Sequence, residues 1–185
     1  MGQIKAIITD FDGTLVDTFL ANLNAYQEAF KYYGYELTEE QYRKYYGLRF
    51  DAFCDKMNIS KEHRNDIKTL KKNIYPKFFN YLNLNKNLMV FIVSCKKQGI
   101  KTCIASTASK DNLYNVLNYF KIKDYFDIII SGENVSHGKP NPEVYNKALA
   151  LLDCDSDEAL VFEDSNVGCE AAENADLKYI KIIKI

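Results

Sequence analysis

A short apolar segment that runs straight into two carboxylates and a glycine constrains this fold most. Residues 6–9 have the apolar pattern of a strand, and Asp10, Asp12 and Gly13 follow at once. The two aspartates are two positions apart, so on an extended backbone their side chains leave the same side and can share one ligand. Magnesium is the natural candidate, because hard divalent cations prefer carboxylate oxygens and usually arrive with a phosphate. The alternative is a solvated turn, since Asp, Gly and Thr are common where strands end.

Three further polar positions, each after a predicted strand, argue against a simple turn. Ser106 directly follows one apolar strand, Lys139 lies beyond a second, and Glu163 and Asp164 follow the apolar residues of a third. In an open parallel sheet the carboxyl ends of the strands share one edge, and ligands bind in the crevice there. We therefore expect these distant segments to converge on one site.

The rest of the chain alternates between helical and strand patterns, which predicts an α/β sheet built by right-handed crossovers. Pro140 and Pro142 mark the start of one helix. The expected helices cover residues 88–98, 110–119, 144–152 and 165–175, and the expected strands cover 100–105, 126–130, 159–163 and 179–185.

A long helical block interrupts this alternation after the first strand. Apolar residues recur at helical spacing from Phe19 to Tyr33, and Thr38 with Gln41 has the form of a capping box. We expect residues 16–84 to be entirely helical and to form a separate unit. Because this block leaves the core just beyond Asp12, we expect it to act as a lid. The predicted domains are 1–15 with 85–185, and 16–84.

Composition narrows the possible partners. Of the 185 residues, 24 are Lys or Arg and 25 are Asp or Glu, so a formal net charge of −1 gives no broad case for binding nucleic acid or a membrane. The five cysteines form no closely spaced pair, which favours a reduced, cytoplasmic setting. We see no secretory signal. The predicted last strand could leave an exposed edge, so we expect a monomer or a weak homodimer.

Four ordered motifs resemble the haloacid dehalogenase superfamily, specifically its phosphatases and phosphomutases with a small helical cap. The first is the segment 10–14, and the second is 104–107. The third is 138–142, and the fourth is 161–165 with Gly168. The resemblance spans nearly the whole chain and implies a Rossmann-like parallel sheet core with a helical cap domain inserted after the first strand.

The resemblance also implies a chemistry. Asp10 would be the nucleophile that attacks phosphorus and forms an aspartyl phosphate, and Asp12 would be the general acid and base. Ser106, Thr107 and Lys139 would bind the phosphoryl oxygens. Thr14 would bind phosphate or hold the loop, and a hydroxyl that merely ends the turn is equally consistent with its position.

Magnesium would be held by Asp10, the backbone carbonyl of Asp12, and the acidic pair. Asp164 is the expected direct ligand of that pair, and Glu163 a direct or water-mediated one. Mg²⁺ would neutralise the charge of these carboxylates and align the attack.

The loop 45–50 resembles the cap loop that reads the substrate in relatives, although its arginine is offset by one position. Gly47 and Arg49 are therefore specificity candidates, and Lys77 on the last cap helix is a weaker one. The alternative is that such exposed cations are simply solvated.

Several other functions compete with a phosphatase. Dehalogenation is disfavoured, because those relatives lack the second aspartate found at position 12. A β-phosphoglucomutase-like sugar phosphomutase is closer, but the histidine of those enzymes falls at Asn22. A receiver-like signalling domain would lack the helical block. A catalytically silent phosphate-binding or regulatory protein stays open.

The sequence thus predicts a magnesium-dependent phosphatase that acts on a small phosphorylated metabolite, of the phosphoglycolate or sugar phosphate type.

Overall fold

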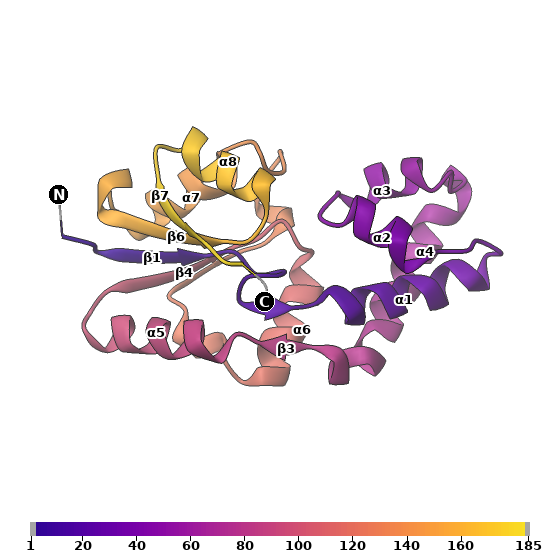
Figure 1. Cartoon of the computed structure of the whole chain (residues 1–185), viewed down its shortest axis with the longest axis horizontal. Coiled ribbons are helices and arrows are strands. Elements are labelled where there is room, and N and C mark those ends of the chain that lie inside the picture. The colour runs from indigo at the N-terminus through magenta and orange to yellow at the C-terminus, as the bar shows by residue number, and fades with distance from the viewer. Residues whose placement is uncertain (1–2, 184–185) are drawn as a thin grey trace. The chain divides into compact units, whose positions relative to one another are not determined.

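A computed structural model describes residues 3–183, and Figure 1 shows its central parallel sheet. The strand order is β5-β4-β1-β6-β7, and every neighbouring pair is parallel. All four residues of the central strand β1 are buried, as expected for a parallel strand with both faces covered. The strands are β1 (Ala6–Thr9), β4 (Lys101–Ala105), β5 (Ile128–Ile130), β6 (Ala159–Glu163) and β7 (Lys178–Lys181).

Four helices connect these strands and cover the two faces of the sheet. Figure 1 shows α5 and α6 on one face and α7 and α8 on the other. Small buried residues of α7 and α8, including Ala148, Ala171 and Ala172, belong to the core cluster that packs on the sheet. The helices are α5 (Lys86–Lys97), α6 (Lys110–Phe120), α7 (Glu143–Leu152) and α8 (Asn166–Asn174). The predicted α/β fold class is therefore confirmed.

The bounds of several elements differ from those predicted. Helix α5 begins at Lys86 rather than at residue 88, because the side chain of Asn85 accepts the Leu88 N–H at 3.1 Å and caps the helix. Strand β7 covers Lys178–Lys181, while the strand predicted at 179–185 runs into residues 184–185, which lie outside the described residues.

The chain divides into two compact units. One comprises Met1–Asp17 and Asn83–Ile185, and the other comprises Thr18–Leu82. The second unit contains α1 (Phe19–Tyr32), α2 (Glu39–Tyr45), α3 (Phe50–Lys56), α4 (Lys61–Ile74) and the 3₁₀ segment η1 (Tyr75–Tyr81).

The expectation of continuous helix over residues 16–84 is wrong at both ends. Two short strands, β2 (Val16–Asp17) and β3 (Asn83–Leu84), pair there as an antiparallel ribbon. The backbone N–H of Asn85 donates to the Leu15 carbonyl at 2.9 Å, and its side-chain amide donates to the Thr14 carbonyl at 3.2 Å. The two segments that join the insertion to the core are thereby held next to the first motif, residues 10–14.

Aromatic packing and the predicted capping box organise the second unit. Phe30 stacks on Phe53 with ring centroids 5.6 Å apart, and Tyr26 meets Phe53 edge to face at 5.3 Å. The Thr38 hydroxyl accepts the Gln41 N–H at 3.1 Å, while the Gln41 side chain accepts the Thr38 N–H at 2.9 Å. The capping box expected at Thr38 is confirmed.

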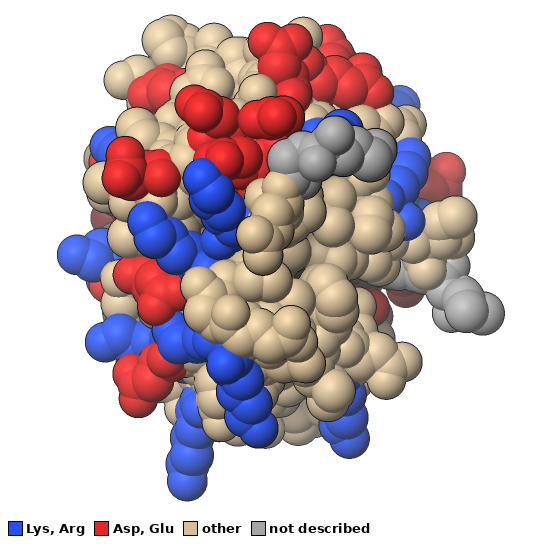
Figure 2. Space-filling model, turned by 90° about the vertical axis from the view of Figure 1, so that its left-hand side faces the viewer, with Lys and Arg blue, Asp and Glu red and all other residues tan. Residues whose placement is uncertain are grey.

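Charges of both signs share the face of the molecule that Figure 2 shows. Most of the Asp and Glu side chains in this view gather towards its top, most of the Lys and Arg side chains lie at its left and below, and uncharged surface fills much of the rest. Among residues 3–183, no helix combines the length and the hydropathy that a membrane crossing requires.

Candidate active site

Asp10 lies where β1 ends, at the carboxyl edge of the sheet. Its backbone N–H donates to the Phe162 carbonyl of the neighbouring strand at 2.9 Å, so the strand pairing fixes its position. The residue is only 8% exposed. A carboxylate held this deep requires compensating partners.

Lys139 is the principal partner of Asp10. Its Nζ donates to Asp10 Oδ1 at 2.6 Å and to Glu163 Oε1 at 2.5 Å, and only 7% of its side chain is exposed. Burial lowers the pKa of Lys139, but the charges of Asp10, Tyr145 and Glu163 raise it more, so the net pKa lies well above its ordinary value. The side chain is therefore an ammonium ion at neutral pH.

Glu163 is held by four donors and is 1% exposed. Oε1 accepts Lys139 Nζ and the Tyr145 hydroxyl, the latter at 3.2 Å. Oε2 accepts the Ser165 N–H at 2.9 Å and the Ser165 hydroxyl at 3.1 Å. Both oxygens are thus engaged, and the carboxylate has a fixed orientation.

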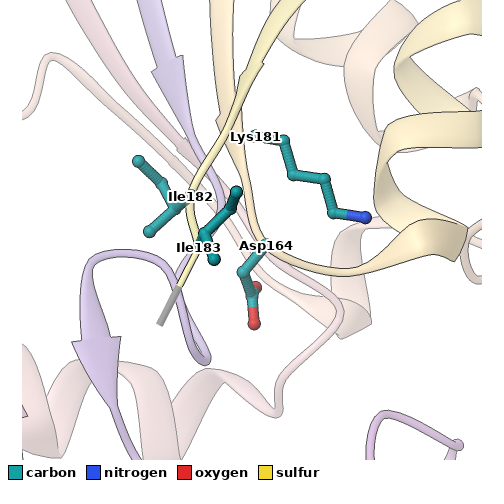
Figure 3. Close-up of a pocket in the computed structure, with 4 residues that line it drawn as sticks. All are labelled: Asp164, Lys181, Ile182 and Ile183. Atoms are coloured by element: carbon teal, nitrogen blue, oxygen red, sulfur yellow. The ribbon is translucent and has the colours of Figure 1, made fainter. Parts of the chain in front are cut away.

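Asp164 is oriented by the first motif. The Thr14 hydroxyl donates to Asp164 Oδ1 at 2.9 Å. Gly13 has φ +95°, and a Cβ at this position would overlap the Asp164 carboxylate. Asp164 also lines an open pocket of about 470 Å³ together with Lys181, Ile182 and Ile183 (Figure 3).

One carboxylate oxygen from each of Asp10, Glu163 and Asp164 lies within 4.8 Å of the other two. Burial raises the pKa of Asp10. Lys139 opposes that rise, and the charge of Glu163 adds to it, so the net pKa lies well above its ordinary value. Such a cluster of hard oxygen donors fits a divalent cation, whose charge would favour the ionised form of Asp10.

Asp12 lies half-buried in the turn that follows, where it forms an isolated bridge with Val16. It is near enough to Asp10 that its negative charge contributes to raising the pKa of Asp10.

Ser106 and Thr107 begin the loop between β4 and α6. Ser106 is buried, and its Oγ accepts the Ala108 N–H at 3.0 Å. The Gly132 N–H donates to the Ala108 carbonyl at 2.7 Å, and a Cβ on Gly132 would overlap the Thr107 carbonyl. The loop therefore packs against the backbone that follows β5.

The three cap candidates lie in the second unit. Gly47 is exposed and has φ +87°, and exposed Arg49 is the N-cap of α3. Lys77 pairs with Glu28 at 3.0 Å, and both side chains are largely exposed. Among the predicted site residues, hydrogen bonds join Lys139 to Asp10 and to Glu163, and another hydrogen bond joins Thr14 to Asp164.

Sequence reasoning missed two polar groups. One is Tyr145, whose hydroxyl binds Glu163 and whose ring centroid lies 5.0 Å from Lys139 Nζ. The other is Lys71 in the second unit, which is buried, donates to Asn22 Oδ1 at 2.7 Å and lies 3.9 Å from the Tyr75 ring centroid. Its position four residues after Ile67, on the apolar face of α4, was the available signal.

Comparison with known proteins gives consistent results. A family model described as haloacid dehalogenase-like hydrolase matches residues 7–182. The chain is 28% identical over 181 residues to a phosphorylated carbohydrates phosphatase of Thermotoga maritima, covering 96% of this chain and 84% of that protein.

Two solved structures are also similar. CbbY of Rhodobacter sphaeroides, solved in complex with phosphate, superposes with a TM-score of 0.90 at 26% identity, covering 99% of this chain and 88% of that one. The β-phosphoglucomutase of Clostridium difficile gives a TM-score of 0.84 at 22% identity, covering 98% and 86%, a likeness that concerns the fold.

Proposed function

Because this chain belongs to the haloacid dehalogenase-like hydrolases and is therefore an enzyme, we propose that it is a magnesium-dependent phosphatase. It hydrolyses a small organic phosphate monoester through an aspartyl-phosphate intermediate. The observation that carries this proposal is the buried Lys139 ammonium between Asp10 and Glu163, beside Asp164 at the carboxyl edge of the sheet. A fixed cation next to a carboxylate nucleophile suits the transfer of an anionic phosphoryl group.

Asp10 and Asp12 carry the covalent steps. A carboxylate oxygen of Asp10 forms a bond to phosphorus while the bond from phosphorus to the ester oxygen breaks, and Asp12 donates its proton to that departing oxygen. Asp12 then takes a proton from water, whose oxygen attacks phosphorus. The bond to Asp10 breaks, inorganic phosphate leaves and the Asp10 carboxylate is restored.

Magnesium would bind Asp10, Asp164 and the backbone carbonyl of Asp12, and the clustered carboxylates support this. Glu163 would contribute directly or through a water, and its engagement by four protein donors favours the indirect role. When bound, the cation neutralises the acidic cluster and the incoming phosphate.

The phosphoryl oxygens would be bound by Lys139, by Ser106 and by Thr107. Lys139 contributes a point charge, and Ser106 contributes a hydroxyl at the end of β4. For Thr14, the hydrogen bond to Asp164 supports a positioning role rather than direct phosphate binding.

The helical insertion would serve as the cap that selects the substrate, with Gly47 and Arg49 in its reading loop and Lys77 as a further cation. The ion pair between Lys77 and Glu28 gives Lys77 a structural partner. The similar Thermotoga protein, a phosphatase of phosphorylated carbohydrates, favours a sugar phosphate over phosphoglycolate. Closure of such a cap would exclude water.

A sugar phosphomutase is the second candidate, supported by the Glu163–Asp164 pair, which resembles the acidic pair of such enzymes. Asn22, at the position of the mutase histidine, instead binds Lys71 in this chain, which favours hydrolysis. We further propose a cytoplasmic enzyme, a monomer or weak homodimer, with no nucleic acid or membrane partner. The free thiols of all five cysteines support the reduced setting.

The test is phosphate release from a panel of sugar phosphates, phosphoglycolate and nucleotides, with magnesium or EDTA. The wild type is compared with Asp10→Asn and with the exposed control Glu170→Gln. We expect turnover that needs magnesium, is abolished by Asp10→Asn and is unchanged by Glu170→Gln. Turnover that persists in Asp10→Asn would remove the proposed nucleophile, and conversion of one sugar phosphate isomer to another would favour the mutase.

A further inference from the structure

The loop that carries Lys139 is tied to the first turn of α7 by one carboxylate. The backbone N–H groups of Ser136 and His137 donate to the two different oxygens of Glu143, each at 2.7 Å. His137 Nδ1 also lies 3.0 Å from Glu143 Oε2. The Ser136 and His137 N–H groups lower the pKa of Glu143, which keeps this carboxylate ionised at neutral pH. Charge-assisted bonds of this kind are stronger than neutral ones.

Further hydrogen bonds fix the same loop on the other side of Lys139. The Asn141 N–H donates to the Gly138 carbonyl at 3.1 Å, and the Glu143 N–H donates to Asn141 Oδ1 at 3.0 Å. One turn along α7, Lys147 Nζ donates to the Asn134 carbonyl at 2.8 Å. The backbone on both sides of Lys139 is thus attached to the start of one helix.

The opposite face of α7 is locked into the core beside the Lys139 ammonium. Val144, Tyr145 and Ala148 are fully buried. The Tyr145 hydroxyl donates to Glu163, and its ring lies 5.0 Å from Lys139 Nζ. The packed helix α7 therefore holds both the backbone of the loop that carries Lys139 and the Tyr145 side chain next to Lys139 Nζ. Supporting contacts of this kind set how accurately a functional group is placed.

We propose that Glu143 is a positioning residue for Lys139. By holding the N–H groups of Ser136 and His137, it sets the path of the loop so that the Lys139 ammonium reaches Asp10 and Glu163. The importance of Lys139 for turnover rests on the proposed phosphatase function, but the placement of Lys139 is measurable without any activity.

The first readout is the rate at which acetic anhydride acetylates Lys139, measured by mass spectrometry relative to exposed Lys61. In the wild type the buried, ion-paired amine reacts slowly. Glu143→Ala frees the loop, and we expect Lys139 to react several-fold faster. The isosteric Glu143→Gln keeps one acceptor oxygen without the charge, so we expect an intermediate rate, and this variant covers the case in which the alanine variant folds poorly.

The second readout is kcat on the best substrate of the phosphatase panel. A displacement of a catalytic group by about 1 Å can cost roughly 100-fold in rate, so we expect Glu143→Ala to lower kcat by about 10- to 100-fold. His137→Ala is the matched control, because it removes the exposed imidazole that contacts Glu143 while both backbone N–H groups remain. We expect this control to change either readout by less than about twofold.

Each outcome decides a different point. Unchanged acetylation of Lys139 in Glu143→Ala overturns the proposal, as does faster acetylation with wild-type kcat. An equal effect of His137→Ala would assign the role to the side-chain pair and would also overturn it. If the wild type hydrolyses no phosphorylated compound while Lys139 still reacts faster in Glu143→Ala, the phosphatase fails and the positioning role stands.

Discussion

At the scale of single residues, two glycines leave room for the acidic pair Glu163 and Asp164 at the end of β6. Gly13 approaches Asp164, and Gly168 in the first turn of α8 approaches Glu163, each so closely that a Cβ would overlap the carboxylate. The oxygen that a Cβ on Gly168 would meet most closely is Oε1, which also accepts the bond from Lys139. Because neither glycine has a side chain, the carboxylates of Asp164 and Glu163 can occupy these positions.

Gly168→Ala tests this directly. In an unconstrained helix, alanine is more favourable than glycine by about 1 kcal/mol. Here we expect the opposite sign, a loss of about 1–3 kcal/mol in the free energy of unfolding, because the Glu163 side chain must leave its position. Thermal unfolding measures the change, with Glu170→Ala on the exposed side of α8 as the control. A stabilised Gly168→Ala variant would show that Glu163 moves without cost.

A second prediction at the scale of single residues concerns Asp127 and the dependence of the protein's stability on pH. Burial raises its pKa, but the bonds from Lys96, the Thr102 N–H and the Thr102 hydroxyl lower it more. A pKa depressed in the folded state contributes stability above the unfolded value of about 3.9 and loses it as pH falls through the folded value.

We therefore expect Asp127→Asn to destabilise the fold by about 1 kcal/mol at pH 7, a modest figure because 42% of the Asp127 side chain is exposed. The difference in melting temperature from the wild type should shrink as pH falls towards about 3. A difference independent of pH from 7 to 3 would show that the charge of Asp127 contributes nothing.

Much of the candidate site could be predicted because its residues follow strands. Asp10, Lys139 and Asp164 each come after an apolar run, and parallel topology brings such positions to one edge. Tyr145 could not be predicted in this way. A tyrosine in the apolar stripe of a helix is indistinguishable from a core residue until the fold places Glu163 next to its hydroxyl.

At the scale of elements, the helices of the second unit begin with different chemistry. Helix α2 starts with the complete capping box of Thr38 and Gln41. Ser60 is the N-cap residue of helix α4, but its hydroxyl donates to Glu62 and, among the described residues, makes no capping hydrogen bond to the helix. Two hydroxyl-bearing N-cap residues thus differ in whether they cap their helix.

Thr38→Ala should accordingly destabilise the protein by about 1 kcal/mol, because it removes the acceptor of the Gln41 N–H. Ser60→Ala is the matched control and should cost only a few tenths of a kcal/mol. Urea unfolding followed by circular dichroism measures both. Equal losses in the two variants would contradict a specific role for the capping box.

Periodicity located the long elements better than the short ones. The stripe around Phe19 and Phe30 predicts α1 because it persists over several turns. Two-residue strands such as β2 and β3 contain no period, and their pairing depends on contacts between residues far apart in sequence. The ribbon could therefore not be predicted from the sequence, whose pattern predicts helix at these residues.

At the scale of the whole molecule, the clustered carboxylates predict that magnesium stabilises the fold. A ligand present at about 100 times its dissociation constant adds about 2.7 kcal/mol if it binds only the folded state. We expect magnesium to raise the melting temperature, EDTA to reverse the rise, and Asp164→Asn to abolish it. Sodium chloride of equal ionic strength is the control. A rise of the same size in Asp164→Asn would exclude Asp164 as a ligand.

The β2–β3 ribbon has a consequence for how such a protein can diversify. Because Asp17 and Asn83 are paired, residues 18–82 leave and re-enter the core at a single point, as a closed loop does in polymer terms. The entropy of closing a loop changes slowly, by about 0.6 kcal/mol for each doubling of a flexible loop's length. The entropy of closure therefore depends little on the number of residues in the insertion. On the proposed function, in which the insertion selects the substrate, exchange of the whole insertion would change substrate choice and leave the site residues of the core in place.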